Sequence, residues 1–350
     1  MDVLDLRGDW AAPPTPAMRA AMADAAVGDD NSVEDPTVNR LERLAADIFG
    51  KEAALFVPSG TMGNLIAILT LAPWGSEVIA GAKSHIVNAE QGGAAVLGGR
   101  SVRVLPNDTA GRMDPVAISR AILPDDIHYP PTGLLCLENT QNQCGGVVLD
   151  LQTMAEQVAP AREAGIPVHL DGSRIWNAAA ALGVSEAAIA ASCDTVQACL
   201  SKGLAAPVGS VLAGTRQAMD TARRHRKLLG GGMRQAGVIA AAGIVALEQM
   251  RPRIGEDHAR ARRLAGALAE RPELNVDLAS VQTNLVYATT ALGINAEALA
   301  AAMEREGIRI SAFGASHLRY AIHYAIDDAG IERTIGATRA ALSGARSVAA

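Results

Sequence analysis

Short apolar runs alternate with helix-like segments along most of the chain. Because these runs are nearly all apolar rather than alternating, they predict strands covered by helices on both faces of a mostly parallel sheet, which is an α/β architecture. The residues predicted as strands are 53–57, 77–80, 102–105, 133–137, 167–170, 195–200 and 210–213. The residues predicted as helices between them are 62–71, 115–122, 151–164 and 175–182.

The pattern changes after about residue 216. Long helical stretches rich in Arg and Ala are predicted over 216–228 and 235–250. A smaller α+β unit follows, with strands predicted at 276–278, 285–288, 308–310 and 318–324, a helix at 296–306 and a closing helix. We therefore expect a large α/β domain over residues 1–250, which includes the N-terminal segment, and a small C-terminal α+β domain over residues 251–350.

The composition of the chain argues against nucleic acid and membranes as binding partners. The chain has 350 residues, 49% of them hydrophobic, and a formal net charge of -6 with no block of like charge. Such a chain can bury a large core and offers no basic surface to nucleic acid or to an anionic membrane. Residues 1–10 lack the basic lead and apolar core of a secretory signal, and the four cysteines show no C-x-x-C spacing. We expect a cytoplasmic protein with reduced thiols and without a metal site.

The strongest candidate for chemistry is Lys202, which follows the apolar run 195–200 almost directly. A lysine at the end of a buried strand carries a costly charge unless it is paired or converted to a neutral species. A Schiff base with an aldehyde cofactor removes that cost. A lysine in an exposed loop would give the same local pattern without any chemistry, so the neighbouring motifs decide between the two.

Three more motifs lie near predicted strand ends. Asp171 follows the run 167–170, where a carboxylate would keep the pyridine nitrogen of an electron-accepting cofactor protonated; it also fits an N-cap of the next helix. The loop 59–63 reads Ser-Gly-Thr-Met-Gly and leads into a helix whose N-terminus offers amide donors to a phosphate. His85 is placed to stack on a ring and to move protons, although a lone histidine is more often structural. Together the four motifs favour a ligand site at the edge where open α/β sheets bind ligands.

Several segments together resemble the threonine aldolase family, whose members are fold-type I enzymes that depend on pyridoxal 5′-phosphate (PLP). The resemblance covers most of the chain, and its most characteristic segment reads Gly-Gly-Gly-Met-Arg-Gln over residues 230–235. The other segments that carry it are 27–30, 34–39, 56–64, 138–140, 169–172 and 199–204. It implies an aspartate aminotransferase-like fold with a mostly parallel, seven-stranded-type sheet, and PLP as the cofactor.

The resemblance also implies how the cofactor is held. Lys202 forms the Schiff base with PLP, Asp171 contacts the pyridine nitrogen, and His85 lies on the face of the ring. The phosphate is bound by the loop residues Ser59, Gly60 and Thr61.

Four basic residues match family positions around the substrate and the phosphate. Arg174 and Arg319 resemble the pair that grips the substrate carboxylate, a task that suits a planar guanidinium, and Arg174 is also placed among the cofactor-binding residues. Arg234 and Lys227 match positions that reach the phosphate from a neighbouring subunit, although Lys227 also fits the basic helix face around residues 223–226. The resemblance therefore implies a homodimer or homotetramer with shared active sites.

The implied reaction is retro-aldol cleavage of a β-hydroxy-α-amino acid into an aldehyde and glycine, or an α-substituted amino acid. His85 is the first candidate for the base that takes the β-hydroxyl proton, and Glu90 is a weaker candidate that also fits a structural role. The same motifs fit aldehyde transfer, β-elimination or transamination, because PLP is the electron sink in all of them. A non-catalytic PLP-binding protein is the remaining alternative.

Departures from the family pattern bear on the substrate. Gly8 stands where the family commonly has a serine close to the substrate carboxylate, and the bulky Trp10 follows it. Gln141 stands where the family commonly has a histidine that contacts the β-hydroxyl, and an amide does not titrate near neutral pH. The segment 318–324 also departs from the family form. We expect Gly8 and Gln141 to border a substrate other than plain L-threonine, such as a β-aryl or α-substituted β-hydroxy amino acid.

Overall fold

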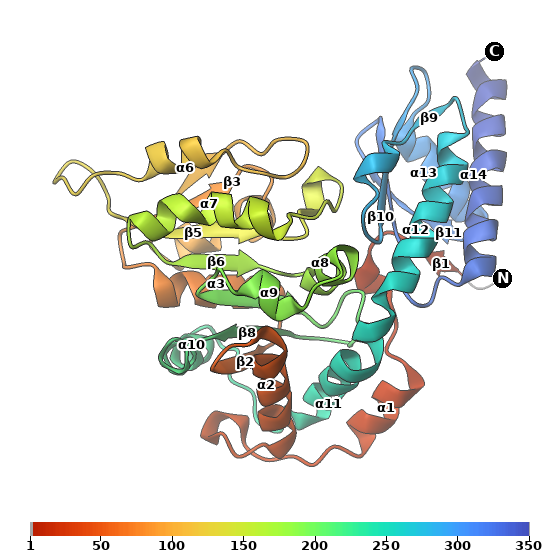
Figure 1. Cartoon of the computed structure of the whole chain (residues 1–350). Helices are drawn as coiled ribbons and strands as arrows, with labels where there is room; N and C mark the ends of the chain where they lie inside the picture. The colour runs from red at the N-terminus through yellow and green to blue at the C-terminus, as the bar shows by residue number, and fades with distance from the viewer. Residues whose placement is uncertain (1–2, 350) are drawn as a thin grey trace.

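A computed structural model describes residues 3–349 of the chain, with side chains described up to residue 343. Its centre is a seven-stranded sheet (Figure 1). In sheet order the strands are β2 (Ala53–Val57), β8 (Ser210–Gly214), β7 (Thr195–Cys199), β6 (Val168–Asp171), β5 (Thr132–Glu138), β3 (Glu77–Gly81) and β4 (Ser101–Leu105). Only β8 in this sheet runs antiparallel to its neighbours. The mostly parallel sheet expected from the apolar runs is therefore confirmed.

Both faces of the sheet are buried, as the apolar runs require. Along β2, Ala54 and Phe56 belong to the largest core cluster, while Leu55 and Val57 belong to a cluster on the opposite face. The largest cluster draws on α2 (Pro36–Phe49), α6 (Pro115–Ala121), α7 (Leu151–Glu163), α8 (Ile175–Leu182), α9 (Glu186–Ala190) and α11 (Gly237–Val245). The other face is covered by α3 (Gly60–Leu71) and α10 (Arg216–Leu228), with the short α5 (Gly93–Val96) near β4.

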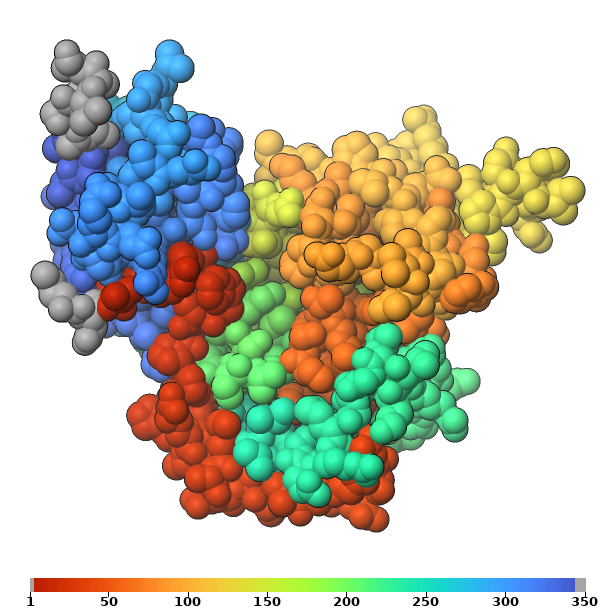
Figure 2. Space-filling view, turned by 180° about the vertical axis from the view of Figure 1, so that it is seen from behind, coloured from red at the N-terminus to blue at the C-terminus, as the bar shows by residue number. Residues whose placement is uncertain are grey.

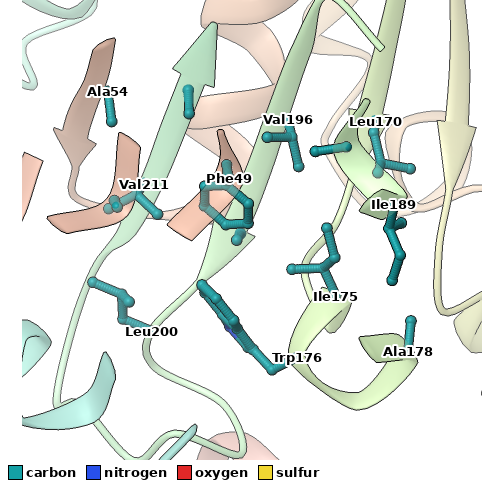
Figure 3. Packing of buried hydrophobic residues seen from close by; sticks show 14 of the residues in the cluster. Phe49, Ala54, Leu170, Ile175, Trp176, Ala178, Ile189, Val196, Leu200 and Val211 are labelled. Carbon is teal, nitrogen blue, oxygen red and sulfur yellow. The ribbon is translucent and has the colours of Figure 1, made fainter. Parts of the chain in front are cut away.

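Aromatic packing fills the middle of the largest cluster. The rings of Phe49 and Trp176 lie 5.3 Å apart at a tilt of 35°. Figure 3 shows them against Val196 of β7 and Leu200, which follows that strand. The tilted pair joins α2 and α8 to the strand that leads to Lys202, so that this strand end has little freedom to move.

Local capping explains where α2 begins and ends. The side chain of Asp35 accepts hydrogen bonds from the backbone N–H groups of Thr37 and Val38, and Pro36 occupies the first helical position. Gly50 ends the helix with φ 60°, a left-handed conformation that favours glycine. Asp35 is fully buried and also accepts from the N–H groups of Gly28 and Gly237, so one carboxylate ties three segments together.

A second unit follows the long helix α12 (Ile254–Ala269). Its antiparallel sheet has the order β12 (Ser311–Phe313), β13 (His317–Ala321), β10 (Leu285–Thr290) and β9 (Leu274–Asn275), packed against α13 (Ala296–Arg305) and α14 (Asp328–Ala349). The N-terminal strand β1 (Leu4–Asp5) pairs in parallel with β11 (Ile308–Arg309), and α1 (Pro16–Ala23) then packs on α11. The N-terminal segment thus spans both units (Figure 1); the division at residue 250 stays a prediction.

The strand predicted at 276–278 is wrong. The chain forms β9 two residues earlier, and residues 278–280 make a 3-10 turn. The cause is local, because the side chain of Asp277 accepts a hydrogen bond from the N–H of Ala279 and so favours a turn over an extended chain. The strand predicted at 318–324 is shorter than expected and ends at Ala321. Within residues 3–349, no helix has the length and apolar character needed to cross a bilayer.

Leu41 tests the packing of α2 on α11. Its side chain is fully buried, and its Cδ atoms lie about 3 Å from the position that a Cβ on Gly243 would take. We expect Leu41→Ala to lower the free energy of unfolding by about 2–5 kcal/mol, because the tight contact leaves a cavity that the backbone cannot fill. Leu292→Ala, at a fully exposed side chain, is the control and is expected to change it by less than about 0.5 kcal/mol in urea denaturation. Equal losses in both variants would contradict this packing.

Candidate active site

The carboxyl ends of the parallel strands meet at one edge of the central sheet and form a cavity of about 300 Å³. Residues that follow β2, β3, β6 and β7 all contribute to it, which brings together motifs far apart in the sequence. The cavity is lined by Pro58, Ser59, Gly60, Thr61, His85, Ser173, Cys199, Ser201, Lys202, Pro207, Val208 and Gly209. The sequence-predicted residues Ser59, Gly60, Thr61, His85 and Lys202 therefore share one cavity.

The loop between β2 and α3 forms one wall. The Ser59 side chain caps α3 by accepting from the N–H of Met62 at 3.2 Å. A Cβ on Gly60 would lie 2.9 Å from the Sγ of Cys199, and one on Gly63 would lie 2.7 Å from Cγ of Gln197. Glycine is thus required here by the close approach of the loop to β7. The start of this twelve-residue helix presents backbone N–H groups and a positive dipole end, which suits a phosphate.

Asp171 ends β6 and is almost fully buried. Its carboxylate accepts hydrogen bonds from the side chain of Asn64 at 2.9 Å and from the N–H of Ser173 at 3.0 Å. It is therefore held in one orientation by groups that donate to its charged form. A fixed buried carboxylate is the partner that a protonated pyridine nitrogen needs.

Asn64 is a site residue to which the sequence reasoning gave no role. Its amide nitrogen donates both to Asp171 and to Glu90, the latter at 2.8 Å, and its oxygen lies 3.0 Å from Nε2 of His169. Because that oxygen only accepts, His169 carries its proton on Nε2 and takes the hydroxyl of Thr195 on Nδ1, at 2.8 Å. Burial lowers the pKa of His169 to about 4, which keeps the ring neutral in this network. Asn64 lies on α3, about one helical turn after the predicted phosphate loop. That proximity in the sequence was the one feature that could have pointed to a role for Asn64 in the site.

His85 begins the short helix α4 (His85–Asn88), just past the end of β3. Its Nδ1 lies 2.7 Å from Oε1 of Glu90, which leaves Nε2 as the ring nitrogen available to the cavity. The hydrogen bond to Glu90 raises the pKa of His85, although partial burial opposes it. Burial raises the pKa of Glu90 in turn. Glu90 therefore orients His85 rather than facing the cavity itself.

Glu138 is a second residue without a role in the sequence analysis. Its carboxyl group accepts from the backbone N–H of His85 at 2.7 Å and of Asn142 at 2.9 Å. Burial, and then the charge of Asp171, raise the pKa of Glu138 to about 7. Through these hydrogen bonds the carboxyl group of Glu138 positions the backbone of His85. His85, Glu90 and Asp171 each offer a ligand atom within 4.8 Å of the others, but these atoms already have the hydrogen bonds described above.

Lys202 lies three residues after the end of β7, with its side chain half-buried at the cavity. Its backbone oxygen accepts from the N–H of Ala205 at 2.8 Å, in a turn where Ala205 has φ 63°. Cys199 is a further cavity residue that was not anticipated. Burial raises the pKa of its thiol, but the nearby charge of Lys202 and hydrogen bonds with Ser173 and Ser210 lower it overall.

Arg174 forms a buried ion pair with Asp9. The Nε and Nη2 atoms of Arg174 each donate to one oxygen of Asp9 at 2.8 Å, and Asn284 donates to the same carboxylate at 3.2 Å. Burial alone would raise the pKa of Asp9, but the Arg174 guanidinium holds it well below its usual range. One edge of Arg174 is thus occupied within the protein, and Nη1 is the group it has left for a ligand.

Arg319, the other predicted carboxylate ligand, lies on β13 and is half-buried. Its Nη2 donates to the backbone oxygen of Arg7 at 2.8 Å, and its buried Nε has no partner among the described residues. Gly8 therefore lies in the chain between Arg7, which binds Arg319, and Asp9, which binds Arg174. Figure 2 shows this N-terminal segment, in red, lying against the blue C-terminal unit.

Gln141 and Arg234 stand apart from the cavity. Gln141 is 1% exposed; its amide nitrogen donates to the backbone oxygen of Lys83 at 2.9 Å, and its oxygen accepts from the N–H of Cys144 at 3.0 Å. Both ends of the amide therefore hold the loop together instead of facing the cavity. The side chain of Arg234 is 70% exposed and pairs with Asp29 at 3.2 Å, and neither Arg234 nor Lys227 lines the cavity of its own chain.

Comparison with known proteins agrees with this geometry. The model of the beta-eliminating lyase family matches residues 5–291. The chain belongs to the beta-eliminating lyase family, among its threonine aldolases. It is 42% identical to low-specificity L-threonine aldolase 1 of Arabidopsis thaliana, over 98% of this chain and 97% of the relative. It is 43% identical to the low specificity L-threonine aldolase of Escherichia coli K12, over 89% and 91%.

The fold is also shared with solved structures. A threonine aldolase of Leishmania major superposes with a TM-score of 0.82 at 19% identity, covering 96% of this chain and 99% of the other. A serine palmitoyltransferase of Sphingomonas wittichii gives 0.76 at 18% identity, covering 99% and 88%. The family and the fold-type I architecture that the sequence predicted are therefore both confirmed.

Glu90 is expected to set the protonation of His85. In Glu90→Gln an acceptor oxygen remains but the negative charge is lost, so the imidazolium of His85 is less stable and its pKa falls. The shift is measured by NMR titration of labelled histidine, with the resonance assigned from His85→Asn. Glu163→Gln, at an exposed position of α7, is the control and leaves that pKa unchanged. An unchanged or higher pKa of His85 in Glu90→Gln would show that Glu90 plays no such part.

Proposed function

We propose that the protein is a PLP-dependent aldolase that cleaves a β-hydroxy-α-amino acid into glycine, or an α-substituted amino acid, and an aldehyde. The observation that carries the proposal is that Lys202, His85 and the N-terminus of α3 share one cavity, next to which Asp171 is hydrogen-bonded by Asn64 and by the backbone of the lining residue Ser173. The relatives that are 42–43% identical over most of the chain are named threonine aldolases, which supports the same reaction.

The residues present fit PLP. Lys202 supplies an amine at the cavity, and Asp171 supplies a buried carboxylate that Asn64 holds in place. The hydroxyl of Ser59 and the first turn of α3 suit the phosphate, and His85 lies where it can cover a ring. When bound, PLP supplies an electron-accepting ring that takes up the electron pair released at Cα when the Cα–Cβ bond breaks.

His85 moves the proton in this proposal. Its Nε2 accepts the proton of the β-hydroxyl group as the Cα–Cβ bond breaks, and Glu90 stabilises the imidazolium through Nδ1. Glu138 accepts a hydrogen bond from the backbone N–H of His85 and so holds the backbone that carries the ring beside the cavity. The same imidazolium can return a proton to the product, so the residue ends the cycle in its starting state.

Arg174 and Arg319 orient the substrate carboxylate. Among the described residues, Nη1 of Arg174 and both Nη1 and the buried Nε of Arg319 have no hydrogen-bond partner, and these N–H groups are the proposed donors. Holding the carboxylate fixes rotation about the bonds of Cα, and that rotation decides which bond lies parallel to the π system of the ring.

The substrate in this proposal is not plain L-threonine. The indole of Trp10 fills the space beside Gly8 and so changes the shape of the proposed carboxylate side, and Gln141 has no titratable group and has both ends of its amide occupied. A β-aryl or α-substituted β-hydroxy amino acid fits these changes. The proposal places the reaction in the cytoplasm, where cysteines stay reduced; the four cysteines form no disulfide with one another.

The proposal includes a homodimer or homotetramer with shared active sites. In one chain the phosphate side of the cavity is lined by Ser59, Gly60 and Thr61, and the lining lysine, Lys202, would be committed to the aldehyde group of PLP. A phosphate dianion is bound more tightly when cations also reach it. Lys227 and Arg234 of a neighbouring copy are the proposed source, and the exposed side chain of Leu228 beside them suits a contact between subunits.

Product analysis tests the function. The PLP-loaded protein is given L-threonine, L-allo-threonine, L-phenylserine and L-α-methylserine separately, and products are identified by mass spectrometry. We expect an amino acid plus an aldehyde, with L-phenylserine or L-α-methylserine converted faster than the threonines. Lys202→Ala is the control and is expected to lose turnover by at least about a thousandfold, because it removes the covalent nucleophile.

Each other result has a distinct meaning. Fastest cleavage of L-threonine would keep the aldolase and remove the proposed substrate preference. Ammonia with a keto acid, and no aldehyde, would replace retro-aldol cleavage with another PLP reaction.

A further inference from the structure

Position 8 is occupied by a glycine because Trp10 fills the space of its side chain. A Cβ on Gly8 would lie 1.9 Å from Nε1 of Trp10 and 2.5 Å from the two carbons on either side of that nitrogen. Gly8 has φ -168°, an extended conformation that any residue adopts, so the backbone does not require glycine. The indole therefore presents its N–H edge at the place where a side chain at position 8 would begin.

The indole of Trp10 is held in this place by a cation–π contact with Arg7. The guanidinium of Arg7 lies 5.7 Å from the centre of the indole ring, and Arg7 is itself fixed by a hydrogen-bonded ion pair with Asp5. The Trp10 side chain remains 53% exposed. Among the described residues, none accepts a hydrogen bond from its indole N–H, so this donor is available to a ligand.

The N–H edge of Trp10 lies at Gly8, whose two chain neighbours hold the arginines of the proposed carboxylate site. Gly8 is bonded to Arg7, whose oxygen holds Arg319, and to Asp9, whose carboxylate holds Arg174. Arg319 also has a buried Nε without a partner among the described residues. The indole N–H thus lies at Gly8, and the residues on either side of Gly8 in the chain hold the two arginines. N–H donors of this kind suit an anion with two oxygens.

We propose that the indole N–H of Trp10 binds the carboxylate of the amino-acid substrate, together with Arg174 and Arg319. The inference rests on the proposed function. If the proposal holds, the glycine at position 8 and the tryptophan at position 10 compensate for each other. The indole N–H of Trp10 then replaces the hydroxyl donor of the serine that the family commonly has at position 8. Trp10 is then a substrate-binding residue of this chain.

Binding of a small amino acid tests the inference without relying on turnover. Glycine and glycinamide are titrated into the PLP-loaded protein while the cofactor absorbance is followed. Trp10→Phe keeps an aromatic ring for Arg7 but removes the N–H. We expect the dissociation constant of glycine to rise about tenfold or more, and that of glycinamide, which has no carboxylate, to stay the same.

The chain offers a matched control in Trp74. It is also exposed, and Arg100 lies over its ring at the same 5.7 Å, but it precedes β3 and so lies at the opposite end of the strands from the cavity. Trp74→Phe is expected to change neither dissociation constant.

A rescue variant separates binding from shape. Gly8→Ser alone should weaken glycine binding, because the new Cβ collides with the indole. Gly8→Ser combined with Trp10→Ala should bind glycine more tightly than Trp10→Ala alone, because a hydroxyl donor then stands at position 8.

Equal loss of glycine and glycinamide binding in Trp10→Phe, or no loss of either, would overturn the inference and leave the aldolase proposal intact. If glycine causes no absorbance change in the unmodified protein and no substrate yields an aldehyde, the proposed function falls, and this inference falls with it.

Discussion

The buried ion pair between Asp9 and Arg174 is the contact on which the arrangement of the molecule depends. It joins the N-terminal segment to the loop after β6, and Asn284 adds the C-terminal unit to the same carboxylate. Both charged side chains are nearly inaccessible to solvent. Removing two charges from water costs several kcal/mol for each ion, and only close, well-directed hydrogen bonds offset that cost. The pair therefore allows very few relative placements of these three segments.

That constraint divides the active site into two halves with different origins. The half that faces the ring of the cofactor is built by the central sheet, where Asn64 links Asp171, Glu90 and His169 in one hydrogen-bonded network. The half that we propose faces the substrate carboxylate is built where the N-terminal segment meets β13 and the loop after β6. The first half uses rigid strand ends, which suits cofactor chemistry. The second uses a segment outside the sheet, in which Asp9 is fixed by its buried ion pair while Trp10 stays partly exposed.

Local signals account for what was predictable. The strands of the central sheet lie within one or two residues of the apolar runs, because a strand buried on both faces leaves no choice of residue type. The ends of α2 depend on equally local contacts, since Asp35, Pro36 and Gly50 act through their own backbone neighbours. The small unit was predicted less well. Its sheet is half exposed, and short polar contacts such as that of Asp277 decide where a strand begins.

The sequence by itself determined the α/β architecture and the positions of Lys202, Asp171, His85 and the loop 59–63 near strand ends, because the apolar runs mark where each strand ends. Only the tertiary structure decided which side chains complete the site. Asn64 and Asp171 are 107 residues apart and Asp9 and Arg174 are 165 apart, so no local pattern links them. The placement of Trp10 over Gly8 and the burial of the Gln141 amide also depend on side-chain packing. Such contacts are set by the three-dimensional meeting of distant segments, where a fraction of an ångström separates a hydrogen bond from a collision.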